Sequence, residues 1–182
     1  MKNLTVRGIL ILFTFIYSIS GASASTYIGG GLGKATWDLK PVLGSYELDD
    51  AVALRLFGGI RSGNLGGEAE LSFSSHDWKY FGGSASHNAG SIILSGVGYL
   101  PITSTFELYG KIGMNLWSTT VELLGETYEG DDGVDLAFGL GLNLKVTEEL
   151  LIRLEYQSLP GLGDGLDEGD IKQYTVNFAL NY

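Results

Sequence analysis

The sequence predicts an all-β fold, an eight-stranded antiparallel up-and-down transmembrane β-barrel. Three observations lead to this expectation: a composition rich in glycine and aromatic residues, strict two-residue alternation of apolar and polar side chains, and connections that alternate between short and long. The chain has 182 residues, enough for one domain of ordinary size. Its 28 glycines suit turn-rich β structure, because each glycine inside a helix costs about 1 kcal/mol.

The first 24 residues are predicted to be a secretory signal peptide that is removed. Lys2 and Arg7 form a short basic region, residues 8–17 are almost wholly apolar, and Ala22-Ser23-Ala24 fits a cleavage site before Ser25. A membrane anchor is the alternative, but the apolar run is shorter than the roughly 20 residues that a spanning helix needs. Because this segment holds two basic and no acidic residues, cleavage changes the formal charge from −10 to −12 and leaves a barrel domain of residues 25–182.

Composition excludes several classes of function. The absence of cysteine rules out disulfides, thiolate metal sites, cysteine nucleophiles and a lipidated N-terminal cysteine. A chain this acidic should repel nucleic acid and anionic lipid headgroups, so no nucleic-acid partner is expected.

The clearest strand pattern lies at the end of the chain. There five apolar residues of one parity alternate with polar or small ones: Tyr174, Val176, Phe178, Leu180 and Tyr182. The same alternation predicts strands within residues 52–61, 68–74, 107–117, 135–145 and 150–157. Two weaker segments, residues 26–37 and 91–99, bring the total to eight, and the run from Ile92 to Leu94 leaves the facing of the latter open.

The predicted connections alternate in length. Segments 62–66, 101–105 and 146–149 are short, whereas 38–50, 75–88, 118–133 and 158–171 are long. Short turns on one rim and long loops on the other are typical of outer-membrane barrels.

Alternation alone does not say which face is outside, because a soluble lipocalin-like barrel would place its apolar face inside. Here the polar parity mixes small residues with long charged ones, which suits a cramped interior, whereas the apolar parity is long and branched. Aromatic residues at strand ends also suggest two girdles at the membrane surfaces. The predicted girdles are Tyr27, Tyr99 and Tyr182 at the short-turn rim and Trp37, Trp117, Tyr156 and Tyr174 at the long-loop rim.

A barrel of eight strands has an interior only wide enough for side chains. Five charged residues of the inward parity are expected to enter it: Arg55, Glu70, Lys111, Arg153 and Glu155. Buried charges require partners, so we expect a salt-bridged plug rather than an open pore.

Several segments resemble the transmembrane domain of the outer membrane protein A family. The strongest is Val146-Thr147-Glu148-Glu149 leading to Arg153-Leu154-Glu155-Tyr156-Gln157 and then Gly163-Asp164, which is similar to the seventh strand of that family. Gly98-Tyr99, Pro101-Ile102-Thr103 and Leu108-Tyr109-Gly110-Lys111 resemble the turn between strands four and five, and Tyr27, Gly29 and Leu32-Gly33 resemble the first strand. No counterpart of that family's periplasmic peptidoglycan-binding domain follows.

The resemblance implies an internal ion-pair network to which Glu70, Arg153 and Lys111 belong. Gly96 and Asn143 stand where the family carries a lysine and a glutamate, so the alternative pairing thought to gate conductance in the family is in doubt here. The alternating apolar C-terminus, with Tyr174, Phe178, Leu180 and Tyr182, resembles the signal that the barrel-assembly machinery reads.

Other candidate sites have simpler explanations. Ser74, Ser75, His76 and Asp77 could suggest a hydrolase, but triads are assembled by geometry rather than by adjacency, and no catalytic activity is predicted. Acidic residues of the last loop form a weak metal candidate, without EF-hand spacing: Asp164, Asp167, Glu168 and Asp170. No cofactor is expected.

The expected function is structural and surface-interactive: a monomeric barrel of a Gram-negative outer membrane that presents four acidic loops for adhesion or as a receptor for a phage or host molecule. Its expected partners are outer-membrane lipid, lipopolysaccharide and the barrel-assembly machinery. The alternative is a narrow, porin-like channel of low conductance, and an outer-membrane enzyme ranks third.

Overall fold

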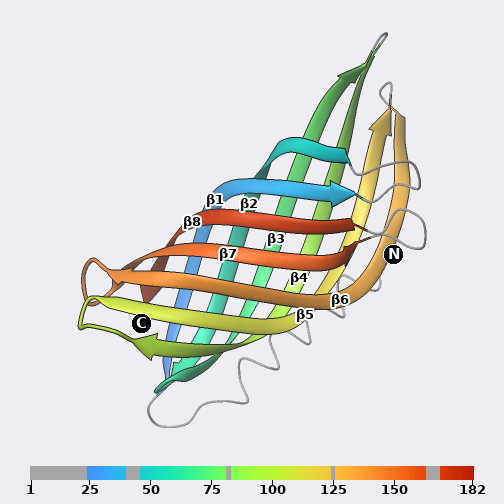
Figure 1. Cartoon of the computed structure of the whole chain (residues 1–182). Helices are drawn as coiled ribbons and strands as arrows, with labels where there is room; N and C mark the ends of the chain where they lie inside the picture. Colours follow the sequence, from blue (N-terminus) through green and yellow to red (C-terminus); the bar gives the residue numbers. More distant parts are fainter. Residues whose placement is uncertain (1–23, 40–45, 81–82, 124–125, 163–168) are drawn as a thin grey trace.

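The computed structural model describes residues 24–39, 46–80, 83–123, 126–162 and 169–182. Eight strands fill these ranges: β1 (Ser25–Leu39), β2 (Tyr46–Ser62), β3 (Leu65–Tyr80), β4 (Gly83–Pro101), β5 (Phe106–Leu123), β6 (Glu126–Lys145), β7 (Leu150–Leu162) and β8 (Gly169–Asn181). Each strand pairs antiparallel with its neighbours in sequence, and β1 also pairs with β8, so the sheet closes into a barrel (Figure 1). The predicted fold class and strand number are confirmed.

The rim that carries the chain end at Tyr182 is built from three short turns. Between β2 and β3 the turn needs only Gly63 and Asn64, and Gly63 has a φ of 61°, which favours glycine. The other two turns share one design. In each, the threonine hydroxyl accepts a hydrogen bond from a backbone N–H three residues later: Phe106 N–H to Thr103 and Leu150 N–H to Thr147, both at 2.9 Å. We refer to this rim as the periplasmic rim, because outer-membrane barrels place their short turns on the periplasmic side.

The apolar parity faces outward, as predicted. On β8 the side chains of Tyr174, Val176, Phe178 and Leu180 are exposed, whereas those of Gln173, Thr175, Asn177 and Ala179 are buried. Ile93, whose facing the sequence left open, is fully buried, and its neighbours Ile92 and Leu94 point outward.

Three aromatic assignments were wrong. Tyr27, Tyr99 and Trp117 do not join an outer girdle, because each points into the interior and is less than 10% exposed. Their polar atoms have partners there: the hydroxyls of Tyr27 and Tyr99 lie 3.0 Å apart, and the Trp117 indole N–H donates to Asp135 at 2.6 Å. Tyr182, Tyr156 and Tyr174 do lie on the outer face, and the side chain of Trp37 lies outside the described part.

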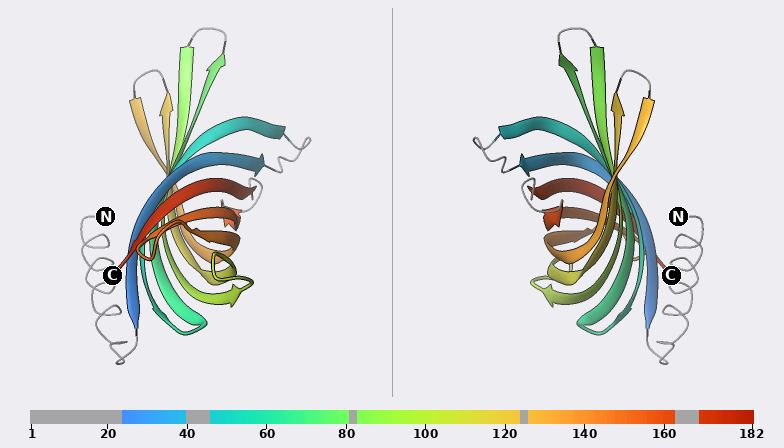
Figure 2. Two further views of the ribbon diagram at one scale, coloured as in Figure 1. Left: turned by 90° about the vertical axis from the view of Figure 1, so that its left-hand side faces the viewer. Right: turned by 90° about the vertical axis from the view of Figure 1, so that its right-hand side faces the viewer.

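Two segments expected as loops are instead paired strands. The β3–β4 hairpin stays paired to Tyr80 and Gly83, and the β5–β6 hairpin to Leu123 and Glu126. Both stand clear of the barrel on the side opposite the short turns (Figure 2). Polar composition suggested loops, but strands outside the membrane need no apolar face.

Candidate functional site

Six charged side chains from four strands meet inside the barrel and form what we call the ion cluster. They are Arg55 of β2, Glu68 and Glu70 of β3, Lys111 of β5, and Arg153 and Glu155 of β7. Each is at most 5% exposed. Three cations thus face three carboxylates, so the cluster is formally neutral.

Each cation of the ion cluster contacts more than one carboxylate. The Lys111 ammonium lies 2.6 Å from Glu70, 2.7 Å from Glu155 and 3.2 Å from Glu68. Arg55 pairs with Glu70 and lies 2.9 Å from Glu155. Because these contacts of Lys111 and Arg55 join side chains of different strands, the cluster ties β2, β3, β5 and β7 together.

Arg153 pairs with Glu68 and Glu155 rather than with Glu70. Its Nη1 donates to Glu68 at 2.7 Å, and its Nη2 lies 3.8 Å from Glu155, whereas Glu70 pairs with Arg55 and Lys111. The Arg153 guanidinium also lies 4.6 Å from the ring centroid of Phe57 and 4.4 Å from that of Tyr109, distances at which the ring faces attract a cation.

Neutral side chains take up remaining hydrogen bonds of the ion cluster. Tyr27 donates to Glu68 at 2.9 Å and Tyr109 donates to Glu155 at 2.5 Å. Thr175 accepts from Arg55 at 2.9 Å. Some buried polar atoms have no partner among the described residues, including Glu70 Oε1 and both amide atoms of Asn115. Such atoms are typical places for internal water.

The large inward side chains fit because their cross-strand partners are glycines. Tyr109 pairs with Gly141 and Lys111 with Gly139. A Cβ at Gly139 would lie 2.7 Å from the Lys111 side chain, and one at Gly141 would collide with the Tyr109 ring. The high glycine content therefore serves close packing of the interior.

A second ion pair lies nearer the periplasmic rim. Arg61 donates two hydrogen bonds to Glu107, at 2.8 and 2.7 Å, and Asn143 donates a third at 3.0 Å. Sequence reasoning did not include Glu68, Arg61 or Glu107 among its candidates. Their inward parity was the available signal, since Glu68 shares the parity of Glu70.

The structure does not place Gly96 in the interior, where the family pattern would put a lysine. Gly96 is exposed on the outer face of β4, so it does not occupy an interior position where a lysine would stand. Asn143 does face the interior and is 2% exposed.

The interior changes character toward the extracellular side. Beyond the ion cluster, nine buried apolar residues form what we call the extracellular apolar cluster: Ala35, Ala51, Ala53, Ala89, Ile93, Trp117, Ala137, Leu159 and Ile171. On β2, Ala53 and Ala51 follow Arg55 in that direction. The described interior therefore holds two different fillings, paired charges and, toward the extracellular side, a cluster of apolar side chains.

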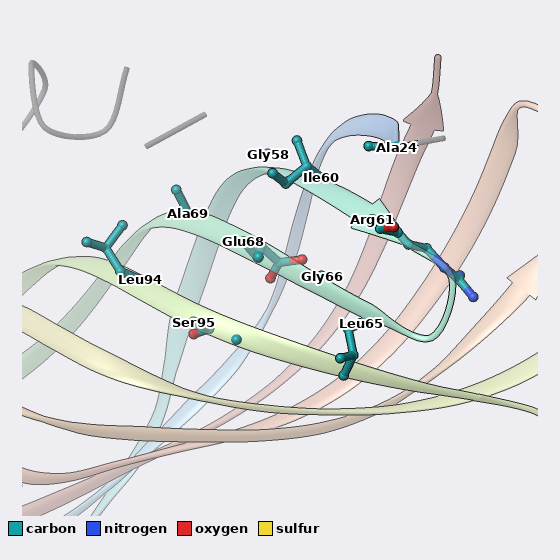
Figure 3. Close-up of a pocket in the computed structure, with 14 residues that line it drawn as sticks. Ala24, Gly58, Ile60, Arg61, Leu65, Gly66, Glu68, Ala69, Leu94 and Ser95 are labelled. Carbon is teal, nitrogen blue, oxygen red and sulfur yellow. The ribbon is translucent and has the colours of Figure 1, made fainter. Parts of the chain in front are cut away.

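The outer wall carries shallow apolar hollows. One, of about 470 Å³, lies over β2, β3 and β4 near the periplasmic rim, where the outward positions Gly58, Ala69 and Gly96 are small (Figure 3). A Cβ at Gly96 would meet nothing closer than 4.0 Å, in contrast to the interior glycines.

Other candidate residues are not brought together. Ser74 is buried and Ser75 exposed, so they face opposite sides of β3, and the side chains of His76 and Asp77 lie outside the described part. Asp164, Asp167 and Glu168 also lie outside it. Within the described residues, no three histidine or acidic side chains are placed to hold a metal ion. No helix there has the length and hydropathy to cross a membrane.

A closed eight-stranded barrel with an apolar outer wall, a charged interior and short turns on one rim defines a small transmembrane barrel of the bacterial outer membrane. The outer membrane protein β-barrel domain model matches residues 9–182. The chain belongs to this family and lies in the outer membrane.

Solved structures share the fold at low sequence identity. Neisserial surface protein A is 17% identical, with a TM-score of 0.72 over 87% of this chain and 98% of that one. Ail, the attachment invasion locus protein of Yersinia pestis, solved with the heparin analogue sucrose octasulfate, is 14% identical, with a TM-score of 0.65 over 88% and 99%. The N-terminal barrel of Pseudomonas aeruginosa OprF is 11% identical, with a TM-score of 0.55 over 87% and 97%. No curated protein matches the chain by sequence.

Proposed function

We propose that this protein acts at the cell surface, where its barrel holds two projecting hairpins that bind an extracellular macromolecule in adhesion or reception. The observation that carries the proposal is the length of these hairpins. Pairing of β3 with β2 ends at Ser75, and pairing of β6 with β7 ends at Phe138, yet both hairpins continue. They also pair with each other, since β4 and β5 are joined up to Ala85 and Leu123. Four paired strands form a stiffer platform than separate loops would.

Charge suggests the chemistry of the partner. The four long segments 38–50, 75–88, 118–133 and 158–171 hold 14 acidic residues and two lysines, whereas the rest of the chain from Ser25 onward holds seven acidic and seven basic residues. The whole net charge of residues 25–182 thus lies in these four segments, which we assign to the extracellular side. A cationic partner surface would be attracted to them. A polyanion such as the heparin analogue bound to Ail would be repelled.

The test is to shorten the hairpins without touching the barrel. Replacing residues 77–86 and 120–129 by two-residue Asn-Gly turns should keep folding, because the described residues of both ranges lie beyond the barrel wall. Adhesion of cells that display the variant to host-cell surfaces should fall to the level of cells without the protein. A matched control changes the exposed Glu148 and Glu149 of a periplasmic turn to glutamine. Undiminished adhesion after shortening both hairpins contradicts the proposal, as does failure of the hairpins to transfer binding when grafted onto an unrelated barrel.

A narrow channel is the second candidate, supported by the unpartnered polar atoms that could hold water in the interior. The extracellular apolar cluster opposes it, because ions crossing an apolar layer lose their hydration. Single-molecule conductance in planar bilayers decides between them. Silent, folded barrels support the surface role, whereas discrete steps support a channel.

A further inference from the structure

We propose that Lys34 and Lys172, together with the apolar wall beneath them, form a binding site for a phosphate-bearing lipid of the outer leaflet. This site is separate from the proposed surface role, because it lies on the lipid-facing wall and not on the projecting hairpins. It depends on the placement of the two lysines, on their aromatic neighbours and on an apolar hollow that continues from them.

The two lysines are the basic side chains that point outward in the described part of the membrane wall. Lys34 is exposed and alternates along β1 with the inward residues Gly33 and Ala35. Lys172 is partly exposed and lies between the buried residues Ile171 and Gln173 of β8. The inward parity is carried by Arg55, Arg61, Lys111, Lys145 and Arg153, and Lys79 belongs to the projecting β3–β4 hairpin rather than to the wall.

The register places these lysines next to each other. Lys34 pairs with Tyr174, and Lys172 lies two residues from Tyr174 on the same face, so the lysines are diagonal neighbours across β1 and β8. Diagonal neighbours on a sheet are about 7–8 Å apart, within reach of two long side chains that close on one anion. Both lysines also interact within the chain. The hydroxyl-bearing Thr36 pairs directly with Lys172 on the same face.

Along the barrel wall, Lys34 and Lys172 lie at the level expected for the lipid headgroups. Along β8, the outward residues from the periplasmic side are Leu180, Phe178, Val176, Tyr174 and then Lys172. The apolar part of β1 likewise ends at Leu32, one outward position before Lys34. Tyr174 and Tyr156 stand between the apolar and charged levels, with ring centroids 5.1 Å apart. Tyrosine followed by lysine is the expected order where hydrocarbon meets headgroups.

An apolar hollow of about 670 Å³ lies beneath the lysines on the outer wall. It extends over β5 to β8 and is lined on its outer face by Leu108, Leu140, Leu142, Leu154, Tyr156, Tyr174 and Val176. Tyr174 belongs both to this hollow and to the neighbourhood of Lys34, so the two features are continuous. A lipid would place its acyl chains in the hollow and its phosphate at the lysines.

The site would offset an electrostatic repulsion between the acidic extracellular segments and the phosphates of the surrounding lipid. Phosphates of lipopolysaccharide would be repelled by the net negative surface, and two lysines at the headgroup level would offset that repulsion. Asp170, one outward position farther from the membrane than Lys172, is the nearest described acidic residue on that face of β8. It competes with phosphate for the lysines, so its removal should strengthen lipid binding.

The experiment measures retention of lipid A by the refolded protein with native mass spectrometry, using lipid A with its phosphates and the same lipid after enzymatic dephosphorylation. Near a membrane surface each lysine contributes about fivefold to the affinity for anionic lipid. We expect wild type to prefer the phosphorylated lipid at least about tenfold. The Lys34→Gln, Lys172→Gln double variant should lose that preference, and Asp170→Asn should increase it. Lys145→Gln, which removes an exposed lysine at the periplasmic rim, is the matched control and should change nothing.

Three results would overturn the inference: equal retention of both lipids by wild type, an unchanged preference in the double variant, or full displacement by millimolar inorganic phosphate, which would indicate a site for free phosphate. Heat-dependent gel migration reports folding, and the single variants Lys34→Gln and Lys172→Gln serve if the double variant does not fold. The assay contains no extracellular partner, so its outcome leaves the proposed adhesive role untouched.

Discussion

Arg153 of β7 and Glu68 of β3 form an ion pair across the barrel interior, with Nη1 and Oε2 2.7 Å apart and both side chains at most 2% exposed. Tyr27 donates to the same Glu68 oxygen at 2.9 Å, which links the pair to the first strand. Residues 85 positions apart in sequence thereby fasten opposite walls of the barrel.

Arg153→Ala should lower the stability of the folded barrel by about 3–5 kcal/mol, because Glu68 would remain buried and charged without its closest cation. The midpoint of urea unfolding in liposomes or micelles measures this. Lys145→Ala is the control, since that lysine is exposed at the rim. An unchanged midpoint for Arg153→Ala would show that the pair contributes nothing to stability.

The Arg153–Glu68 pair should also behave as a unit. Arg153→Met combined with Glu68→Gln should cost less than the sum of the two single changes, because the double variant leaves neither charge stranded. We expect a coupling energy of about 1–3 kcal/mol from a double-mutant cycle. Strict additivity would contradict direct pairing.

Leu140→Arg should hinder insertion, because Leu140 lies midway along the apolar outer face of β6 and is 66% exposed to the lipid side. An arginine near the midplane costs about 2–4 kcal/mol. Phe178→Arg on β8 should act in the same way. Val146→Arg, in a periplasmic turn, should fold normally, so equal folding yields in liposomes for all three would refute the assigned facing.

Substitution should destabilise the barrel at an inward glycine but not at an outward one. Gly141→Ala should destabilise by about 1–3 kcal/mol, since its Cβ would collide with the Tyr109 ring. Gly98→Ala should stay within about 0.5 kcal/mol of wild type, because a Cβ there has nothing within 4 Å. Comparable unfolding midpoints for the two variants would contradict close packing of the Tyr109 ring against Gly141.

The sequence alone determined the features that depend on local pattern. Two-residue alternation identified six of the strands and their lipid-facing sides, because a strand's side chains alternate regardless of its neighbours. Two weaker segments completed the count of eight, and the facing of residues 91–99 stayed open. The same parity brought Arg55, Glu70, Lys111, Arg153 and Glu155 to the interior, and the alternation of short and long connections separated the two rims.

Only the tertiary structure decided which interior groups meet. The height of a side chain depends on the stagger between strands far apart in sequence, so parity could not say that Arg153 pairs with Glu68 while Glu70 pairs with Arg55 and Lys111. Tyr27, Tyr99 and Trp117 were placed outside because amphipathic aromatics suit either a membrane interface or a hydrogen-bonded interior. The paired strands of the hairpins also escaped prediction: outside the bilayer no burial on one face is required, and without burial the alternation that reveals a strand disappears.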